Sequence, residues 1–155
     1  MTDSNLPKIK IFNLTILFKY KSSSSYEFLE TEDIEFSDSM VLNTYSLYYG
    51  NGARIFNISF EKGDVDDYQY KQCKKNLTKG STEDCDTDQF INYNAEQTSI
   101  LTLPRPVSDV SNIFIKYQRE GDLNQYEHSY QIRNISKPIL LYTNENNSFV
   151  VKEIN

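Results

Sequence analysis

The feature that most constrains the fold of this chain is a two-residue alternation near its N-terminus. Apolar residues occupy every second position from Phe12 to Tyr20, and Asn13 and Thr15 fill two of the positions between them. A strand projects successive side chains to opposite faces, so this spacing puts the apolar residues on one face and the polar ones on the other. The pattern predicts a long strand over residues 8–21 with one buried face.

Shorter segments of the same kind follow along the chain and are separated by acidic, Ser-rich or Gly-containing turns. They cover residues 26–29, 34–36, 40–49, 54–61, 68–73, 90–93, 99–103, 112–119, 126–133, 139–142 and 149–154. The predicted total is about nine to eleven short strands. The tripeptide Gly50-Asn51-Gly52 is the strongest hairpin signal, and residues 74–88 are expected to form a loop.

No segment has the sustained spacing of an amphipathic helix. Aromatic residues make up 14% of the 155 residues, with 12 Tyr, 9 Phe and no Trp, and such side chains suit a half-buried pleated surface. We therefore predict a flexible tail over residues 1–7 and one all-β domain over residues 8–155. The expected architecture is an antiparallel β-sandwich, either an Ig-like Greek key or a jelly roll, with a small closed barrel as the alternative.

The charge of the chain argues against two classes of partner. The net charge is −6 and the pI is about 4.8, so the basic surface that nucleic acid or an anionic membrane requires is not expected. No run of 18 apolar residues is present, which predicts no transmembrane segment. We also find no signal-peptide pattern at the start of this chain.

Five Asn-x-Ser/Thr triplets nevertheless favour a secretory route. An N-linked glycan needs an exposed Asn in this triplet and passage through the secretory pathway. The candidate acceptors are Asn13, Asn57, Asn76, Asn134 and Asn146. An extracellular or cell-surface location is therefore predicted, with a signal peptide that this chain does not carry. A cytoplasmic protein with fortuitous triplets is the alternative.

The two cysteines support the same interpretation. Cys73 and Cys85 lie among polar residues, where free cytoplasmic cysteines are seldom found. A disulfide bond between them would close a surface loop and contribute about 2–3 kcal/mol. A zinc site is not expected because the two cysteines and His128 do not make four ligands.

Two further groups of residues could carry chemistry. Asp84, Asp86 and Asp88 have the spacing that opens a calcium-binding loop, but Gln89 stands where that loop needs glycine. They are weak candidate calcium ligands, and otherwise we expect no cofactor. His128 is the sole histidine and alternates in phase with Tyr126 and Tyr130, so we expect it at the edge of the core rather than in a catalytic triad.

Exposed aromatic residues and the N-terminal strand are the candidate contact surfaces. Tyrosines can anchor a protein interface or stack on sugars, and an amphipathic terminal strand can complete the sheet of a neighbour. The candidate interface residues are Phe12, Leu14, Ile16, Phe18, Tyr48 and Tyr49.

No catalytic motif accompanies these features. We therefore predict a non-enzymatic glycoprotein domain that acts through protein–protein contact, in adhesion, a surface coat or a self-assembling fibre. The alternative hypothesis is a carbohydrate-binding module that uses surface tyrosines and acidic loops, with or without calcium.

Overall fold

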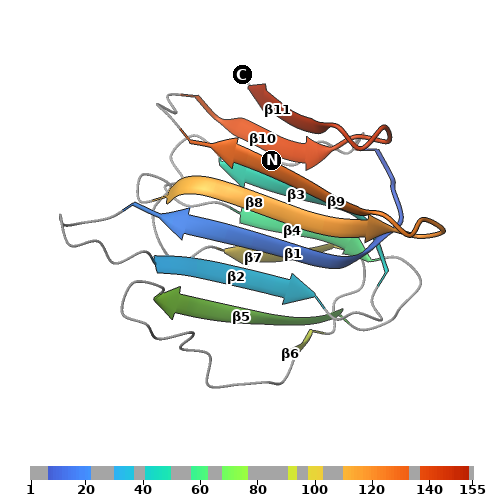
Figure 1. Ribbon diagram of the computed structural model, residues 1–155, viewed down its shortest axis with the longest axis horizontal. Helices are drawn as coiled ribbons and strands as arrows, with labels where there is room; N and C mark the ends of the chain where they lie inside the picture. The colour runs from blue at the N-terminus through green and yellow to red at the C-terminus, as the bar shows by residue number, and fades with distance from the viewer. Residues whose placement is uncertain are drawn as a thin grey trace.

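The structure is a computed structural model that describes residues 7–21, 30–36, 41–49, 57–62, 68–76, 91–93, 98–102, 110–132 and 137–153. Strands and their connecting turns make up these residues, and no helix occurs among them. The strands are β1 (Ile11–Tyr20), β2 (Glu30–Phe36), β3 (Leu42–Tyr49), β4 (Asn57–Lys62), β5 (Tyr68–Asn76), β6 (Ile91–Tyr93), β7 (Thr98–Thr102), β8 (Val110–Arg119), β9 (Gln125–Gln131), β10 (Ile139–Thr143) and β11 (Phe149–Glu153). The all-β prediction is confirmed (Figure 1).

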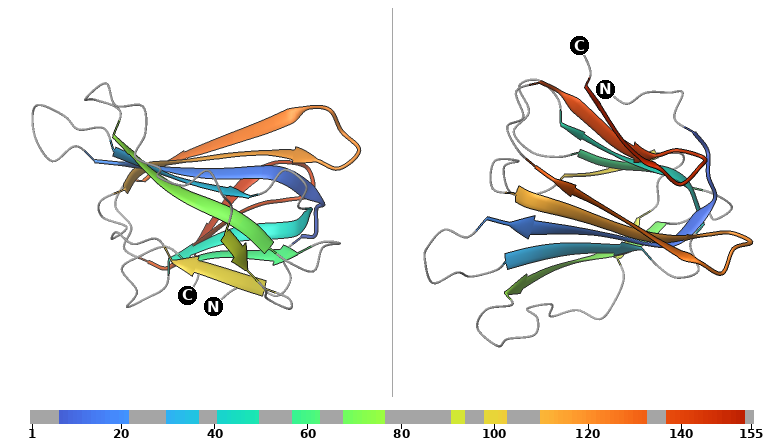
Figure 2. Two further views of the ribbon diagram at one scale, coloured as in Figure 1. Left: turned by 90° about the horizontal axis from the view of Figure 1, so that it is seen from below. Right: turned by 45° about the horizontal axis from the view of Figure 1, so that its top comes forward.

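Every strand pairing in the described residues is antiparallel. One set runs in the order β9-β8-β1-β2-β5-β6, and the other runs β11-β10-β3-β4-β7. The two sets join where Ile11 of β1 pairs with Leu42 of β3. Because the sheet turns at this corner, it curls over itself into a nearly closed, barrel-like shape (Figure 2).

The core lies between the two sets of strands and is built from Ile, Leu, Phe and Tyr side chains. Two aromatic pairs cross it. Phe36 of β2 meets Phe60 of β4 edge to face at 4.6 Å between ring centroids, and Tyr45 of β3 lies 6.4 Å from Tyr117 of β8. Such ring pairs contribute about 0.5–1.5 kcal/mol beyond the apolar area that they bury. They hold together strands that share no backbone hydrogen bonds.

One sequence prediction about β1 is wrong. Ile9 and Ile11 are buried, and the buried phase resumes at Leu14, whereas Phe12 is only half-buried. The reason is a bulge between Phe12 and Thr15, at which Asn13 adopts a left-handed backbone with φ of 55°. The extra residue shifts the alternation by one position, so Phe12 does not share the face of Leu14, Ile16 and Phe18.

Two other predictions concern β3 and β5. β3 and β4 form an antiparallel pair, as the Gly50-Asn51-Gly52 signal predicted, although the turn itself lies outside the described residues. The predicted start of the loop at residue 74 is wrong, because β5 continues through Lys74 and Lys75 to Asn76. Pairing with β2 explains the extension, since the register sets Glu32 opposite Lys74.

Candidate functional site

The β8–β9 hairpin supplies most of the polar and aromatic groups that gather in one place. Its register is unbroken from Asn112 opposite Gln131 to Gln118 opposite Gln125. On β8 the buried residues are Val110, Ile113, Ile115 and Tyr117. On β9 the burial alternates, with Tyr126, His128 and Tyr130 half-buried and the residues between them exposed. The sequence prediction that these three residues share a face at the edge of the core is confirmed.

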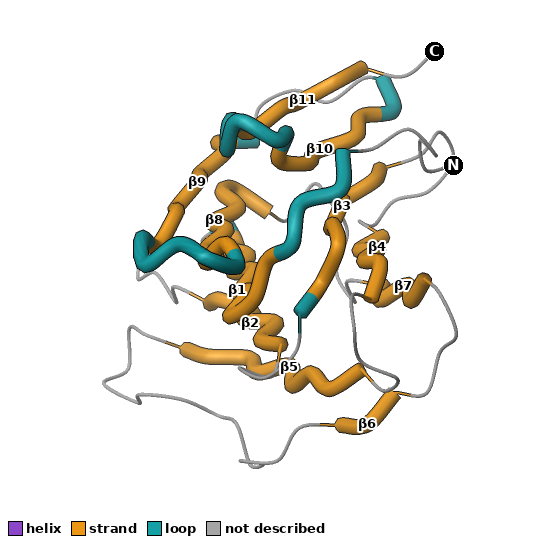
Figure 3. The backbone as a smooth tube through the Cα atoms, turned by 90° about the vertical axis from the view of Figure 1, so that its right-hand side faces the viewer, coloured by secondary structure: helices purple, strands orange, loops and turns teal. Residues whose placement is uncertain are grey.

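An aromatic cluster joins this hairpin to the β10–β11 hairpin. We call it the aromatic seam, and it consists of Tyr117, Tyr126, His128, Tyr130 and Phe149. The imidazole of His128 stacks on Phe149 at 5.7 Å and 17°, and Tyr126 stacks on Tyr117 at 5.5 Å and 25°. In the described residues, β9 pairs only with β8 and β11 pairs only with β10. The seam therefore connects two edge strands through side chains. Figure 3 shows the backbones of these two strands, β9 and β11.

Hydrogen bonds order the inner end of the seam. The Tyr117 hydroxyl donates to Asn147 Oδ1 at 2.8 Å and lies 3.3 Å from Nε2 of His128. With the hydroxyl proton directed to Asn147, the contact between Tyr117 and His128 fits a neutral imidazole that carries its proton on Nε2. Deeper in the core, the hydroxyls of Tyr45 and Thr143 are hydrogen-bonded to each other.

Burial governs the protonation of these groups. It raises the pKa of Tyr117 to about 12 and raises the pKa of Tyr45 further still. Burial also lowers the pKa of His128, because the imidazolium form loses hydration. At neutral pH the side chains of Tyr45, Tyr117 and His128 are therefore uncharged.

The tip of the β8–β9 hairpin is organised by one carboxylate. Asp122 accepts a hydrogen bond from the Tyr126 hydroxyl at 2.5 Å and another from the Asn124 backbone N–H at 2.9 Å. Both bonds favour the ionised form, and the bond from Tyr126 is the main reason that the pKa of Asp122 lies below its usual value. The side chain of Leu123 projects from this ordered turn and is 97% exposed.

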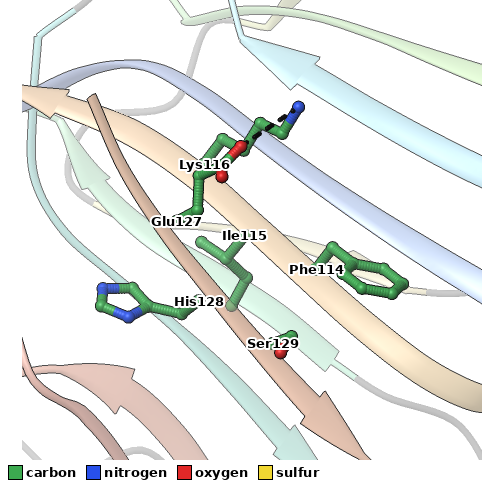
Figure 4. Close-up of a pocket in the computed structure, with 6 residues that line it drawn as sticks. All are labelled: Phe114, Ile115, Lys116, Glu127, His128 and Ser129. Carbon is green, nitrogen blue, oxygen red and sulfur yellow. Dashed lines mark ion pairs between the residues drawn. The ribbon is translucent and has the colours of Figure 1, made fainter.

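A shallow cavity of about 370 Å³ lies against the same hairpin. It is lined by Phe114, Ile115, Lys116, Glu127, His128 and Ser129. Lys116 Nζ lies 3.4 Å from Glu127 Oε1, and Figure 4 shows this ion pair beside the cavity. Both side chains are more than half exposed, so the pair contributes at most about 1 kcal/mol to stability.

Two members of the seam are poorly suited to general base catalysis at neutral pH. A tyrosine whose pKa is about 12 is a poor general base at neutral pH, and Nε2 of His128 lies 3.3 Å from the Tyr117 hydroxyl. Half-buried rings, a hydroxyl and an amide are groups that contact a partner surface.

Four of the five predicted glycan acceptors lie in described strands or turns. Asn146 is exposed in the turn between β10 and β11. Asn13 is half-buried in β1, where its Nδ2 donates to Gln118 Oε1 at 2.5 Å. Asn57 begins β4 and pairs in register with Tyr48.

The fourth of these acceptors, Asn76, ends β5 and pairs in register with Glu30. Asn134 lies outside the described residues. Occupancy of all five acceptors stays a prediction.

The predicted disulfide and calcium site fall largely outside the described part of the chain. Cys73 lies in β5 opposite Asp33, and Cys85 is not among the described residues. Asp84, Asp86 and Asp88 are not described either. Elsewhere, in the residues that are described, no group of three or more His, Cys, Asp or Glu side chains could hold a metal ion.

The predicted interface residues divide between core and surface. Leu14, Ile16 and Phe18 are fully buried in the core, whereas Phe12, Tyr48 and Tyr49 are half-buried. β1 pairs with β2 on one side and β8 on the other, so it lies inside its own sheet. The described residues contain no helix long and apolar enough to cross a membrane.

Sequence reasoning missed Asp122, Asn147 and Phe149 as members of this site. The alternation of Tyr126, His128 and Tyr130 was visible, but nothing in the sequence indicated that β11 would face β9. The one usable signal was Asn144–Ser148, an Asn-rich turn between two apolar segments.

Comparison of the chain with protein-family models, curated protein sequences and solved structures finds no match.

Proposed function

We propose that this chain is a non-enzymatic, secreted or cell-surface glycoprotein domain that acts through protein–protein contact. The observation that carries the proposal is the position of Asn146. It is exposed in a tight turn, where the Asn146 and Ser148 backbone N–H groups donate to Asn144 Oδ1 at 2.9 and 3.0 Å. An acceptor on a projecting, ordered turn is accessible to the glycosylation machinery.

Expression through a eukaryotic secretory pathway tests the glycoprotein part of the proposal. We expect an intact mass above 18.1 kDa that falls on treatment with an N-glycosidase. Ser148→Ala removes the acceptor triplet of Asn146 and should lower the mass by one glycan, whereas Ser148→Thr keeps the triplet and should not. A secreted protein without any glycan would contradict the proposal.

We also propose that the two sets of strands form an antiparallel β-sandwich, of the Ig-like Greek-key or jelly-roll kind, rather than a closed barrel. The support is the single register pair between β1 and β3, together with side-chain contacts in place of pairing between β9 and β11. An experimental structure with a continuous backbone ladder from β9 to β11 would instead establish a barrel.

Carbohydrate binding is the second candidate function. Tyr48 and Tyr49 are half-buried at the end of β3, and tyrosine rings of this kind can stack on sugars. A glycan array probed with and without calcium tests this candidate. Binding that is lost in Tyr48→Ala would favour it, and an array without binding would exclude it.

A further inference from the structure

The edge strand β9 has a sequence that is nearly the same read in either direction. It runs Gln125-Tyr126-Glu127-His128-Ser129-Tyr130-Gln131, so that Gln matches Gln and Tyr matches Tyr around His128. Such symmetry has a structural meaning only for a strand that pairs antiparallel with a copy of itself. Two-fold symmetric contacts place each residue opposite its mirror position in the other copy.

The backbone phase of β9 fits that symmetry. The Ile132 N–H donates to the Ser111 carbonyl, which fixes Ile132 as a residue whose backbone groups point to β8. In an antiparallel pair these groups alternate, so those of Tyr130 and His128 also point to β8, and those of Ser129 and Glu127 point away from it. β9 lies at the outside of the molecule with β8 on its inner side (Figure 3).

The side chains of β9 also restrict where a two-fold axis could lie. A two-fold axis at His128 sets Glu127 opposite Ser129 of the other copy, in pairs that exchange backbone hydrogen bonds. An axis one residue earlier would set Glu127 opposite itself, and like charges directly opposite are destabilising. A two-fold axis at His128 therefore pairs the outward-pointing backbone groups of the two copies and keeps the two Glu127 carboxylates from lying directly opposite each other.

β9 carries few of the features that normally protect an exposed edge. It contains no Lys, Arg, Pro or Gly, its register with β8 has no bulge, and its single charged residue, Glu127, is paired with Lys116 of β8. Natural edge strands are usually blocked by such residues or by bulges. Three independent observations thus point to β9: the symmetry of its sequence, the outward direction of the Glu127 and Ser129 backbone groups, and its few edge-protecting residues.

We infer that β9 is a self-association surface through which two copies of this chain join their sheets edge to edge, with the two-fold axis at His128. The inference rests on the proposed function only in assuming that this chain acts through protein contact. It deepens that function because it names the contact surface and the partner. It requires neither secretion nor glycans. The experiment therefore uses the unglycosylated full chain, and its failure would leave the glycosylation test unaffected.

Sedimentation velocity across a concentration series tests the inference. We expect a monomer–dimer equilibrium for the wild type. Ser129→Pro removes an outward N–H without breaking the β8 ladder, so it should abolish the dimer while the β-type circular dichroism spectrum is kept. Ser129→Ala is the matched control and should still dimerise.

Charge substitutions at the same position give a graded test. Ser129→Glu sets two acidic pairs across the interface and should weaken the dimer by roughly tenfold, and Ser129→Lys should strengthen it. A chain that stays monomeric at every soluble concentration would overturn the inference. So would a dimer that Ser129→Pro and Ser129→Glu leave unchanged.

A disulfide tests the register directly. His128 would face its own copy in a non-hydrogen-bonded pair, whose Cβ atoms lie at the short end of a range of about 4.5–5.5 Å. A disulfide bridges Cβ atoms up to about 4.5 Å apart, so oxidised His128→Cys should give a covalent dimer. Glu127→Cys is the control and should not, because residue 127 lies opposite residue 129 of the other copy. Efficient cross-linking of Glu127→Cys alone would contradict the register.

Discussion

At the scale of single residues, Asn13 has the most unusual environment in the structure. Its backbone is left-handed, its Nδ2 bonds to Gln118, and its Oδ1 is buried without a hydrogen-bond partner. A buried acceptor without a partner costs about 1–3 kcal/mol. Asn tolerates a left-handed backbone better than most residues, which explains why it occupies the bulge.

Two substitutions of Asn13 distinguish the stability effect of its left-handed backbone from the effect of its side chain. Asn13→Ala should lower the free energy of unfolding by about 1–2 kcal/mol through left-handed strain, whereas Asn13→Gly should stay within about 1 kcal/mol of the wild type. Urea unfolding of unglycosylated protein measures both. Equal stability of the two variants would show that the bulge does not impose this conformation.

His128 gives a prediction about pH. Burial depresses its pKa in the folded state, so the folded state favours the neutral ring. This contribution is fully present above the unfolded pKa of about 6.5 and is lost as the pH falls through the folded pKa. The free energy of unfolding should thus decrease between pH 7.5 and pH 5 by more in the wild type than in His128→Gln. Identical decreases in both proteins would contradict this role.

At the scale of elements, the aromatic seam links two hairpins that share no ladder in the described residues. Phe149 contacts both His128 and Tyr130 and is the main connection from β11. Arg119 adds a hydrogen bond from the β8–β9 hairpin to the Glu145 carbonyl at 3.0 Å.

Truncation of Phe149 should loosen this connection. We expect Phe149→Ala to lower the free energy of unfolding by about 1–3 kcal/mol, less than a fully buried Phe because the ring is half-buried. Val151 lies on the same strand and is 38% exposed, so Val151→Ala is the control and should cost under about 1 kcal/mol. If both variants lost the same free energy of unfolding, Phe149 would not be the residue that anchors β11.

The elements themselves were largely predictable from the sequence. Period-two patterns located β1, β4, β8 and β9, because a strand with one buried face must alternate. The bulge at Asn13 was missed. Ile9 and Ile11 alternate out of phase with Leu14 and Ile16 in the sequence, but only the backbone conformation shows at which residue the phase changes. The contact of His128 with Phe149 depends on long-range strand order, which local periodicity does not encode.

At the scale of the whole molecule, stability depends on contacts that cross the core between the two sets of strands. Phe60 is 1% exposed and meets Phe36 from the opposite set. Phe60→Ala should therefore lower the free energy of unfolding by about 3–5 kcal/mol, measured by urea denaturation. A loss below about 1 kcal/mol would mean that these two sets do not pack together as described.

The central claim is that side chains close the sheet between β9 and β11 and leave the outer backbone edge of β9 open for contact. Residue-resolved amide hydrogen exchange measures this most directly. In dilute protein, the amides of His128 and Tyr130 should exchange slowly and those of Glu127 and Ser129 quickly, and the latter two should become protected as concentration rises. Slow exchange at all four amides in the dilute monomer would contradict the claim.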